Sequence, residues 1–389
     1  MKQRANPVNL SELSGQLNIK IKWREGVVEQ VDLTSSRPQR VTCLFNGKLL
    51  LDLLNLIPML YSLCGIAQKV AALRAAESAL DIKASPEVDQ GRNLLVQAET
   101  ARELGLRLFT DWYPDGRGVK AELMKWFAGV KDEYDWALQL NLASSRSLNP
   151  ADVADKLHAI LEPVLSMKPD SGTTENAEDD IWESSVLQSL KPELESFFSR
   201  SQLVELKRGC PELEIVDRTV QHKIAESLKS SKAYQFCAAP EVNGEKFESS
   251  VYTLSLRFNK LKNKEFNGGV KALLFRLNAL ECMLRSMPEQ IKSGSGNSMI
   301  YSDVTGMGIV QAARGVLIHH MELDGHSVSD SVITDYKIVA PTEWNFHPQG
   351  TFVKMLEGSR VNLEQLPILV ESLIRLIDPC VGWQLELDT

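Results

Sequence analysis

The sequence has few cysteines and no excess of positive charge. Its 389 residues include six cysteines and carry a formal net charge of -8. Proteins that bind nucleic-acid phosphates need a cationic surface to release counterions, so this charge argues against a nucleic acid as the main partner. An acidic chain of this kind is typical of proteins that bind other proteins or small ligands.

The sequence also lacks an uninterrupted apolar run long enough to cross a membrane. Its most apolar stretch, Leu49 to Ala67, contains Asp52, Asn55 and Pro58, whereas a membrane-spanning helix needs about 20 predominantly apolar residues. No apolar signal segment follows the first residues, and the cysteines do not form the dense framework of a small secreted domain. We therefore expect a cytoplasmic protein with reduced thiols and no membrane contact.

Hydrophobic periodicity predicts a mainly helical α+β protein. Alternating residues indicate a hairpin over 16–33 that turns at Glu25-Gly26, and a second strand pair over 315–320 and 327–339. Polar stretches over 171–180 and 292–298 predict surface loops. Apolar residues at three- and four-residue spacing predict helices over 48–83, 88–112, 118–140, 150–166, 181–199, 271–290 and 362–377.

Two cysteines near opposite ends of the chain stand alone where a pair is common. Cys64 lies in the turn Leu63-Cys64-Gly65-Ile66-Ala67, and Cys380 lies in Asp378-Pro379-Cys380-Val381-Gly382-Trp383. Thiolates that hold a metal often come as C-x-x-C pairs, because one turn of backbone then presents both sulfurs to one ion. If the fold brings the two turns together, the site offers two soft ligands. These are enough to hold an iron fragment but too few to bridge two metals.

Two further segments accompany the cysteines. They read Gly306-Met307-Gly308-Ile309-Val310-Gln311-Ala312-Ala313-Arg314-Gly315-Val316-Leu317-Ile318-His319 and Val339-Ala340-Pro341-Thr342-Glu343-Trp344-Asn345-Phe346-His347-Pro348. With the cysteine turns, and in this order, they resemble the large subunit of nickel-iron hydrogenases. That family has a C-G-x-C turn, an A-P-R-G segment, a P-T-T-W-N segment and a terminal D-P-C-x-x-C. The resemblance is close over residues 300–383 and weaker over 16–80.

The resemblance implies a fold and a domain organisation. We expect a predominantly helical α+β fold, a hydrogenase large-subunit-like helix bundle with small peripheral antiparallel sheets. A single domain would cover residues 1–389. Within it, 16–83 would hold the N-terminal hairpin and the cysteine-glycine turn, 84–290 the helical middle, and 300–389 the C-terminal region that bears the site.

The departures from the family pattern concern the metal ligands. In the family the first cysteine of each pair is a terminal nickel ligand, and the second bridges nickel to iron. Cys64 and Cys380 match the first, while Ala67 and Trp383 stand in place of the second. Both bridging sulfurs are therefore lost; together with the retained residues that contact the iron's cyanides, this resemblance implies a site for iron without nickel.

The residues that contact the iron's cyanides in the family have counterparts here. The family uses the arginine of A-P-R-G and the hydroxyl residue after proline in P-T-T-W-N, and Arg314 and Thr342 match these positions. A cyanide nitrogen is a small anionic acceptor, so a fixed guanidinium and a hydroxyl are suitable donors. Ala313 and Pro341, the preceding residues, complete the expected cofactor-binding set. Gln311 replaces the family's glutamate and Ala313 its proline, which changes local charge and backbone stiffness.

This combination is similar to the hydrogenase expression/formation proteins of the HupK/HoxV type. The resemblance implies a maturation scaffold rather than an enzyme. Such a scaffold would take iron carrying cyanide and carbon monoxide from the maturation proteins that build and carry it. It would hold the iron transiently through Cys64 and Cys380 and pass it to the hydrogenase large subunit precursor. Two alternatives stay open: a quinone-site or proton-coupling redox subunit similar to the hydrogenase-derived subunit of complex I, and a metal-free protein-protein adaptor.

Four other side chains have expected local roles. His319 and His320 are adjacent on a predicted strand, where only one can face inward. We expect His319 to be a hydrogen-bonded core residue, and Asp378 to fix the turn before Cys380. Trp383 would fill the space where a bridging sulfur and nickel would otherwise sit.

Overall fold

The computed structural model describes most of the chain. The described residues are 15–38, 40–61, 63–113, 117–140, 146–165, 206–258, 271–294 and 298–389. The loop expected over 171–180, the helix expected over 181–199 and part of the loop over 292–298 lie outside these ranges. None of the helices within them is both long and apolar enough to span a bilayer.

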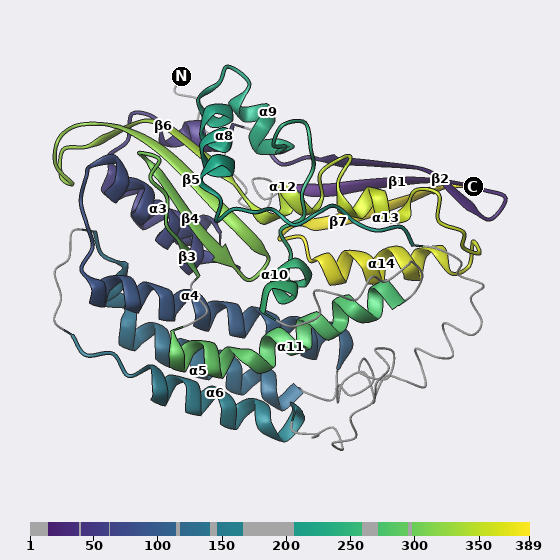
Figure 1. The fold of residues 1–389 in the computed structure, drawn as a ribbon, viewed down its shortest axis with the longest axis horizontal. Coiled ribbons are helices and arrows are strands. Elements are labelled where there is room, and N and C mark those ends of the chain that lie inside the picture. The colour runs from purple at the N-terminus through teal and green to yellow at the C-terminus, as the bar shows by residue number, and fades with distance from the viewer. Residues whose placement is uncertain are drawn as a thin grey trace, which may run out of the picture.

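Four long helices form a bundle in the lower half of Figure 1. They are α4 (Pro86–Arg107), α5 (Arg117–Tyr134), α6 (Pro150–Leu165) and α11 (Lys271–Ser293). The α4 helix packs against α5 and α11, and α11 also packs against α6. The predicted helices over 88–112, 118–140, 150–166 and 271–290 are thus confirmed, with ends shifted by a few residues. Short 3-10 or π turns occupy Val41–Phe45, Leu108–Trp112 and Asp135–Leu138.

The start of α4 shows why the sequence forms a helix there. Ser85 is the N-cap, and its hydroxyl oxygen accepts a hydrogen bond from the Val88 amide. Pro86 follows at the first helical position, where its missing N–H costs no helical hydrogen bond. Glu87 and Asp89 lie in the first turn, where negative charge is favoured by the exposed amide groups.

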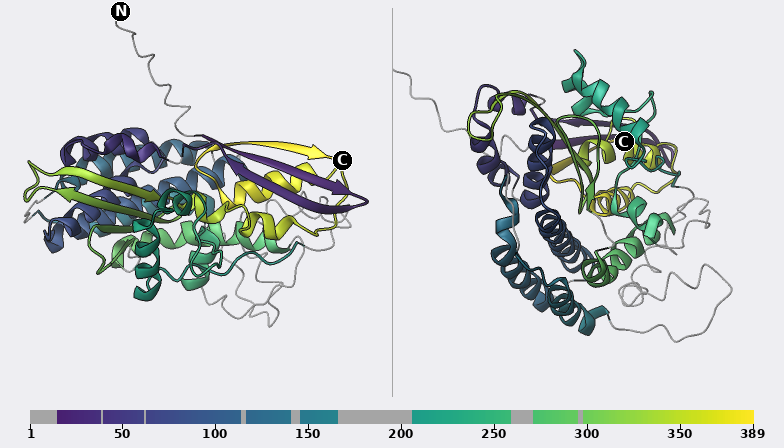
Figure 2. Two further views of the ribbon diagram at one scale, coloured as in Figure 1. Left: turned by 90° about the horizontal axis from the view of Figure 1, so that it is seen from above. Right: turned by 60° about the vertical axis from the view of Figure 1, so that its left-hand side comes forward.

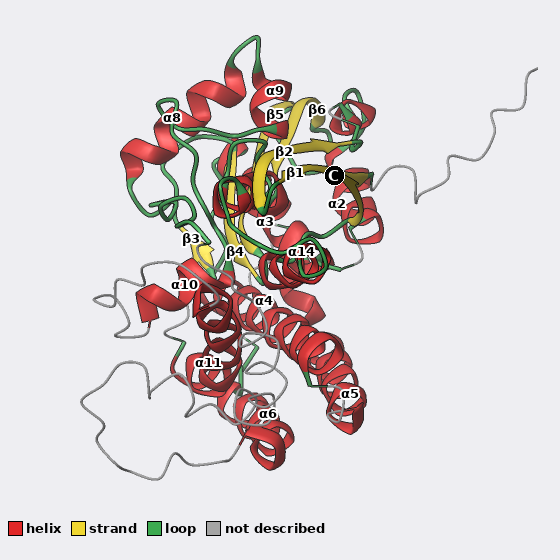
Figure 3. Cartoon of the chain, turned by 90° about the vertical axis from the view of Figure 1, so that its right-hand side faces the viewer, coloured by secondary structure: helices red, strands yellow, loops and turns green. Residues whose placement is uncertain are grey.

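A four-stranded antiparallel sheet lies above the bundle in Figure 3. Its strands are β3 (Met299–Ile300), β4 (Met307–Ala312), β5 (Gly315–Asp324) and β6 (Val332–Val339), in that order. The α3 helix (Gly65–Ala79) packs on one face, and α8 (Arg218–Lys229) and α9 (Ala233–Ala238) lie on the other. The strand pair predicted around Asp324-Gly325 is confirmed as β5 and β6, while β3 and β4 were not predicted.

Both faces of this sheet are buried, which corrects one expectation. His319 points toward α3 and is 0% exposed, whereas His320 points toward the α8 side and is 1% exposed. The prediction that only one of the two could face inward is therefore wrong. Close approach of α3 depends on Gly308, because a Cβ there would lie 2.0 Å from the Ala71 carbonyl oxygen.

A second sheet joins the two ends of the described chain. Its order is β2-β1-β7, in which β1 (Gln16–Arg24) pairs antiparallel with β2 (Val27–Ser35) and parallel with β7 (Gly382–Asp388). Figure 2 shows these three strands side by side. The hairpin predicted over 16–33 is confirmed, but β7 was not predicted and makes this sheet mixed rather than purely antiparallel. The pairing brings the segment after Cys380 beside the N-terminal hairpin.

The helices that flank the cysteines differ from the predicted ones. The helical segment predicted over 48–83 is divided into α2 (Leu50–Leu60) and α3 at the predicted Cys64 turn, and Cys64 is the N-cap residue of α3. The last helix, α14 (Leu366–Ile377), has Gln365 at its N-cap instead of Asn362, and Pro367 lies in its first turn. The remaining short helices are α10 (Val251–Phe258), α12 (Pro341–Asn345) and α13 (Thr351–Leu356).

Candidate functional site

Cys64 and Cys380 line one cavity of about 510 Å³. Cys64 enters it from the start of α3, and Cys380 enters from the turn between α14 and β7. Arg314, in the turn between β4 and β5, lines the same cavity. A small adjoining pocket is also lined by Ala313, Pro341, Thr342, both cysteines and Arg314. The structure thus brings together all six residues that the sequence singled out.

Cys64 lies in a poorly solvated position. Burial of its sulfur raises the pKa of Cys64 to about 12, and the neighbouring Cys380 raises it further. Two groups act in the opposite direction: the Arg314 guanidinium and the Gln68 side-chain amide, whose Nε2 lies 3.7 Å from the Cys64 sulfur. In the metal-free protein Cys64 is therefore a thiol at neutral pH.

Cys380 has stronger hydrogen-bond donors than Cys64. The Arg37 guanidinium donates to the Cys380 sulfur through Nη2 at 3.0 Å, and the Thr342 hydroxyl donates to it at 3.1 Å. The Cys380 amide in turn donates to the Thr342 hydroxyl oxygen at 3.1 Å. Arg37 also forms an ion pair with Glu343. In this structure the Thr342 hydroxyl therefore donates to the Cys380 sulfur, whereas the resemblance implies that it donates to a cyanide on the iron.

Arg314 is held between two carboxylates. It is 8% exposed; its Nη1 donates to Glu103 at 3.0 Å, and its Nε lies 2.8 Å from Asp378. Burial opposes its charge, but Asp378 and Glu103 raise the pKa of Arg314 above its usual value. The guanidinium is thus fixed in a charged state beside both cysteines.

Asp378 does more than shape the turn before Cys380. It ends α14 with a positive φ of 62°, a conformation that few residues other than glycine and asparagine adopt. Its carboxylate also lies 3.2 Å from the Arg107 guanidinium on α4. Asp378 therefore links the end of α14 to both Arg314 and the helix bundle.

A buried carboxylate secures the start of α3. Glu99, on α4, accepts hydrogen bonds from the Ile66 and Ala67 amides, both at 2.9 Å. These amides belong to the first turn of a helix and have no partner within it. Burial raises the pKa of Glu99 to about 7, although the two amide hydrogen bonds oppose this rise. Glu99 thereby fixes the backbone immediately after Cys64.

His319 is a hydrogen-bonded core residue, as predicted. Its Nε2 lies 2.9 Å from the Gln68 side-chain oxygen, and its Nδ1 lies 2.6 Å from the Tyr336 hydroxyl. Burial lowers the pKa of His319 to about 3, so the ring is neutral at physiological pH. Trp383, by contrast, lies in β7 opposite Leu17 and is not among the residues that line the cysteine cavity.

The sequence did not single out Arg37, Gln68, Glu99 or Glu343 as site residues. Gln68 is one helical turn after Cys64, and this spacing is the one local signal that could have identified it. Arg37 and Glu99 reach the site only through long-range contacts. No motif in their own neighbourhood predicts these contacts.

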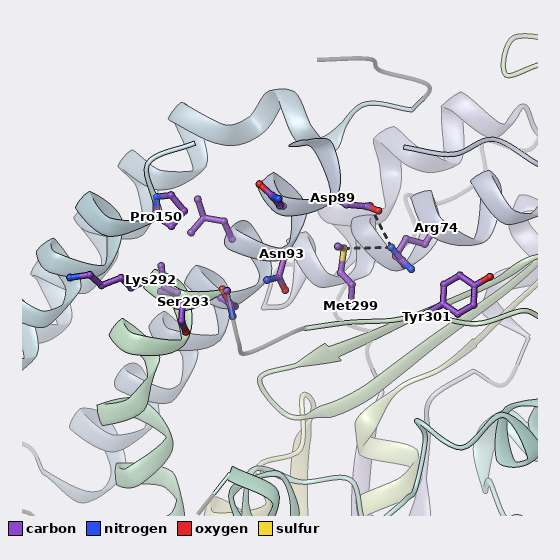
Figure 4. A pocket seen from close by; sticks show the side chains of 13 residues that line it. Arg74, Asp89, Asn93, Pro150, Lys292, Ser293, Met299 and Tyr301 are labelled. Atoms are coloured by element: carbon purple, nitrogen blue, oxygen red, sulfur yellow. Dashed lines mark hydrogen bonds and ion pairs between the residues drawn. The ribbon is translucent and has the colours of Figure 1, made fainter. Parts of the chain in front are cut away.

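A larger cavity, of about 630 Å³, lies between α3, α4, α11 and β3 (Figure 4). Arg74 there is 3.5 Å from Asp89 and 3.7 Å from the Met299 sulfur. None of the residues that line this cavity is a cysteine or a histidine. A larger volume alone therefore does not identify the functional site. The smaller cavity, which is lined by two thiols, is the better candidate for that site.

Known proteins are similar to the C-terminal part of this site and to the chain as a whole. A family model described as nickel-dependent hydrogenase matches residues 277–383. The hydrogenase expression/formation protein HupK of Azotobacter vinelandii is 27% identical, over 96% of this chain and 99% of that protein. The hydrogenase expression/formation protein HupV of Azotobacter chroococcum mcd 1 is 28% identical over the same shares, 96% and 99%.

Solved structures show the same fold at lower identity. The Ni-Fe-Se hydrogenase from D. vulgaris Hildenborough superposes with a TM-score of 0.57 and 15% identity, over 95% of this chain and 97% of that one. An NAD+-reducing [NiFe]-hydrogenase gives a TM-score of 0.57 and 15% identity over 97% of each chain. The α+β fold of the nickel-iron hydrogenase large subunit is thus confirmed, and the chain is similar over nearly its whole length to curated hydrogenase expression/formation proteins, as its sequence predicted.

Proposed function

We propose that this protein is a non-enzymatic maturation scaffold for nickel-iron hydrogenase. It receives iron carrying cyanide and carbon monoxide from the proteins that build it, holds the iron through Cys64 and Cys380, and passes it to the large subunit precursor. The observation that carries the proposal is that these two cysteines line one cavity together with Arg314. The similarity to hydrogenase expression/formation proteins supports the same role.

The chemistry of the cavity suits such a cargo. Thiolates are soft ligands and favour low-spin iron with strong-field partners such as cyanide and carbon monoxide. Within the described ranges, no group of three or more His, Cys, Asp or Glu residues is arranged to hold a metal ion. Two protein sulfurs leave the other coordination positions of the iron to its own small ligands. With Ala67 and Trp383 in place of the bridging cysteines, no sulfur at these positions can join the iron to a second metal.

The cations around the cavity favour an anionic cargo. Arg314 is fixed by Glu103 and Asp378, and a guanidinium held in this way can donate to a cyanide nitrogen without first losing conformational freedom. Thr342 donates to the Cys380 sulfur in the metal-free protein. When iron occupies that sulfur, we propose that the hydroxyl turns toward the second cyanide.

The burial of Cys64 also suits release of the iron. Uptake of iron by Cys64 requires its thiol to lose a proton, and the burial that raises its pKa to about 12 opposes this step. The same burial favours return of the proton when iron leaves, so Cys64 holds iron less tightly than a solvated thiolate would. A protein that must transfer its iron to another protein benefits from this weaker binding.

Infrared spectroscopy tests the proposal directly. The protein, co-produced with the maturation proteins, should show cyanide and carbonyl stretching bands, and both sets should disappear in Cys64→Ala and in Cys380→Ala. Cys282→Ala is the matched control, because this thiol lies on α11 and does not line the cavity. Bands that survive in both cavity variants reject the proposal.

A second candidate, a metal-free adaptor, is favoured by the surface of α2. This helix exposes Leu51, Leu56 and Met59, and exposed apolar groups of this kind often mark protein contacts. An adaptor would not need the site residues. A variant in which Cys64, Arg314 and Cys380 are all alanine would then still restore hydrogenase activity in a strain that lacks this protein.

A further inference from the structure

A chain of buried side chains leads to the Cys64 sulfur. The hydroxyl of Tyr336 contacts His319 Nδ1 at 2.6 Å, His319 Nε2 contacts Gln68 Oε1 at 2.9 Å, and Gln68 Nε2 contacts the Cys64 sulfur at 3.7 Å. Tyr336 and His319 are 0% exposed and Gln68 is 1% exposed. These three side chains come from β6, β5 and α3 and converge behind the cysteine cavity.

The hydrogen bonds in this chain have a fixed direction. An amide oxygen can only accept, so His319 must carry its proton on Nε2 to donate to Gln68. The neutral ring then has no proton on Nδ1, which must accept from the Tyr336 hydroxyl. The remaining amide group of Gln68, its NH₂, is therefore turned toward the Cys64 sulfur.

The opposite orientation of Gln68 is unfavourable while His319 keeps this tautomer. It would place the NH₂ group against the His319 N–H and leave two buried donors without acceptors. A buried donor without a partner costs about 1–3 kcal/mol. With His319 protonated at Nε2, the His319 N–H thus holds the Gln68 amide with its NH₂ group toward the sulfur.

We propose that Gln68, His319 and Tyr336 are positioning residues for Cys64, holding its sulfur toward the cavity and supplying a hydrogen bond to it when it binds iron. This inference rests on the function proposed above. Gln68 lines the small pocket beside both cysteines, whereas His319 and Tyr336 are not among its lining residues and act through Gln68. Outer hydrogen-bond partners of this kind orient a metal ligand and adjust how strongly it donates electrons.

The inference predicts a spectroscopic change. A hydrogen bond to a metal-bound sulfur withdraws electron density, so its removal increases donation from iron into carbon monoxide and lowers the carbonyl stretching frequency. Gln68→Met removes the amide and keeps the length of the side chain. Tyr336→Phe removes the hydroxyl that contacts His319 Nδ1 and so releases that side of the ring. Both variants should shift the carbonyl band to lower wavenumber and retain iron roughly 10–100-fold less tightly.

Matched variants separate this effect from general loss of packing. Gln221 is also a buried glutamine, 0% exposed, and donates to backbone carbonyls of Ile215 and Tyr301 away from the cavity. Tyr134 is a tyrosine that is 2% exposed and accepts from the Asn149 amide. Gln221→Met and Tyr134→Phe should leave the carbonyl band of the loaded protein where it is in the native protein.

A second measurement needs no iron. Nitrogen NMR of metal-free protein with ¹⁵N-labelled histidine reports the tautomer of His319, and the native protein should be protonated at Nε2. Protonation at Nδ1 overturns the inference, whether or not iron binds.

The two proposals can fail separately. If the native protein shows no cyanide or carbonyl bands after co-production, the proposed function fails, and the NMR result still decides the direction of the chain. If the bands are present but neither Gln68→Met nor Tyr336→Phe moves the carbonyl band, the inference fails and the proposed function stands.

Discussion

Glu99→Gln should change how the stability of this protein depends on pH. Glu99 is 4% exposed, and burial raises its pKa to about 7 from the ordinary 4.5. Because the folded protein holds this proton more tightly than the unfolded chain, the free energy of unfolding falls as pH rises from 4.5 through 7. A shift of this size amounts to about 3 kcal/mol in total, at about 1.4 kcal/mol for each pH unit.

Urea unfolding followed by circular dichroism can measure this effect. Between pH 5.5 and pH 8 the native protein should lose about 2 kcal/mol relative to Glu99→Gln, because most of the titration falls in that interval. Taking the difference between the two proteins removes the titration of all other groups. Glu226→Gln, which changes an exposed carboxylate on α8, is the control. A native-minus-variant difference that stays constant across this interval would refute the claim that burial outweighs the two amide hydrogen bonds and raises the pKa of Glu99.

Three further predictions concern the site and the core. Arg314→Lys keeps the charge but loses the forked donors, so the cyanide and carbonyl band intensity should fall without global unfolding. Removal of the charge by Ala should instead destabilise the fold by about 1.5–3 kcal/mol in urea, because Glu103 and Asp378 each lose one of two buried arginine partners and keep only Arg102 and Arg107. Thr342→Val should shift the cyanide bands in the infrared spectrum and cost about 1 kcal/mol through the lost hydrogen bond to Cys380. Burial lowers the pKa of His319 to about 3 and of His320 to about 4. The stability that these two neutral rings contribute should therefore be fully present above pH 6.5 and be lost as the pH drops below it, and His320→Leu should reduce that loss in urea midpoints compared between pH 7 and pH 5.5.

Local patterns predicted those parts of the fold that depend on neighbours in sequence. The hairpin of β1 and β2 follows from alternation around Glu25-Gly26, and the long helices follow from apolar spacing. The strand β7 was not predicted because it pairs with β1, at the other end of the chain, and nothing near residues 382–388 indicates that partner. The break between α2 and α3 lies at the turn that the sequence places at Cys64, as expected from the local pattern.

The same distinction holds for the site. Cys64, Cys380 and Arg314 could be selected because each lies in a short motif with a recognisable order. Arg37 and Glu99 could not, because their roles come from contacts with residues distant in sequence. A buried ion pair or a carboxylate that caps another helix leaves no periodic signal in the chain.

The central claim is that one sulfur from each end of the chain binds the same iron. X-ray absorption at the iron edge, on protein loaded by the maturation proteins, counts these sulfurs directly. The account predicts two sulfur ligands in the native protein and one in either Cys64→Ala or Cys380→Ala, if any iron is retained. Iron without sulfur ligands, or a sulfur count unchanged in both variants, would contradict it.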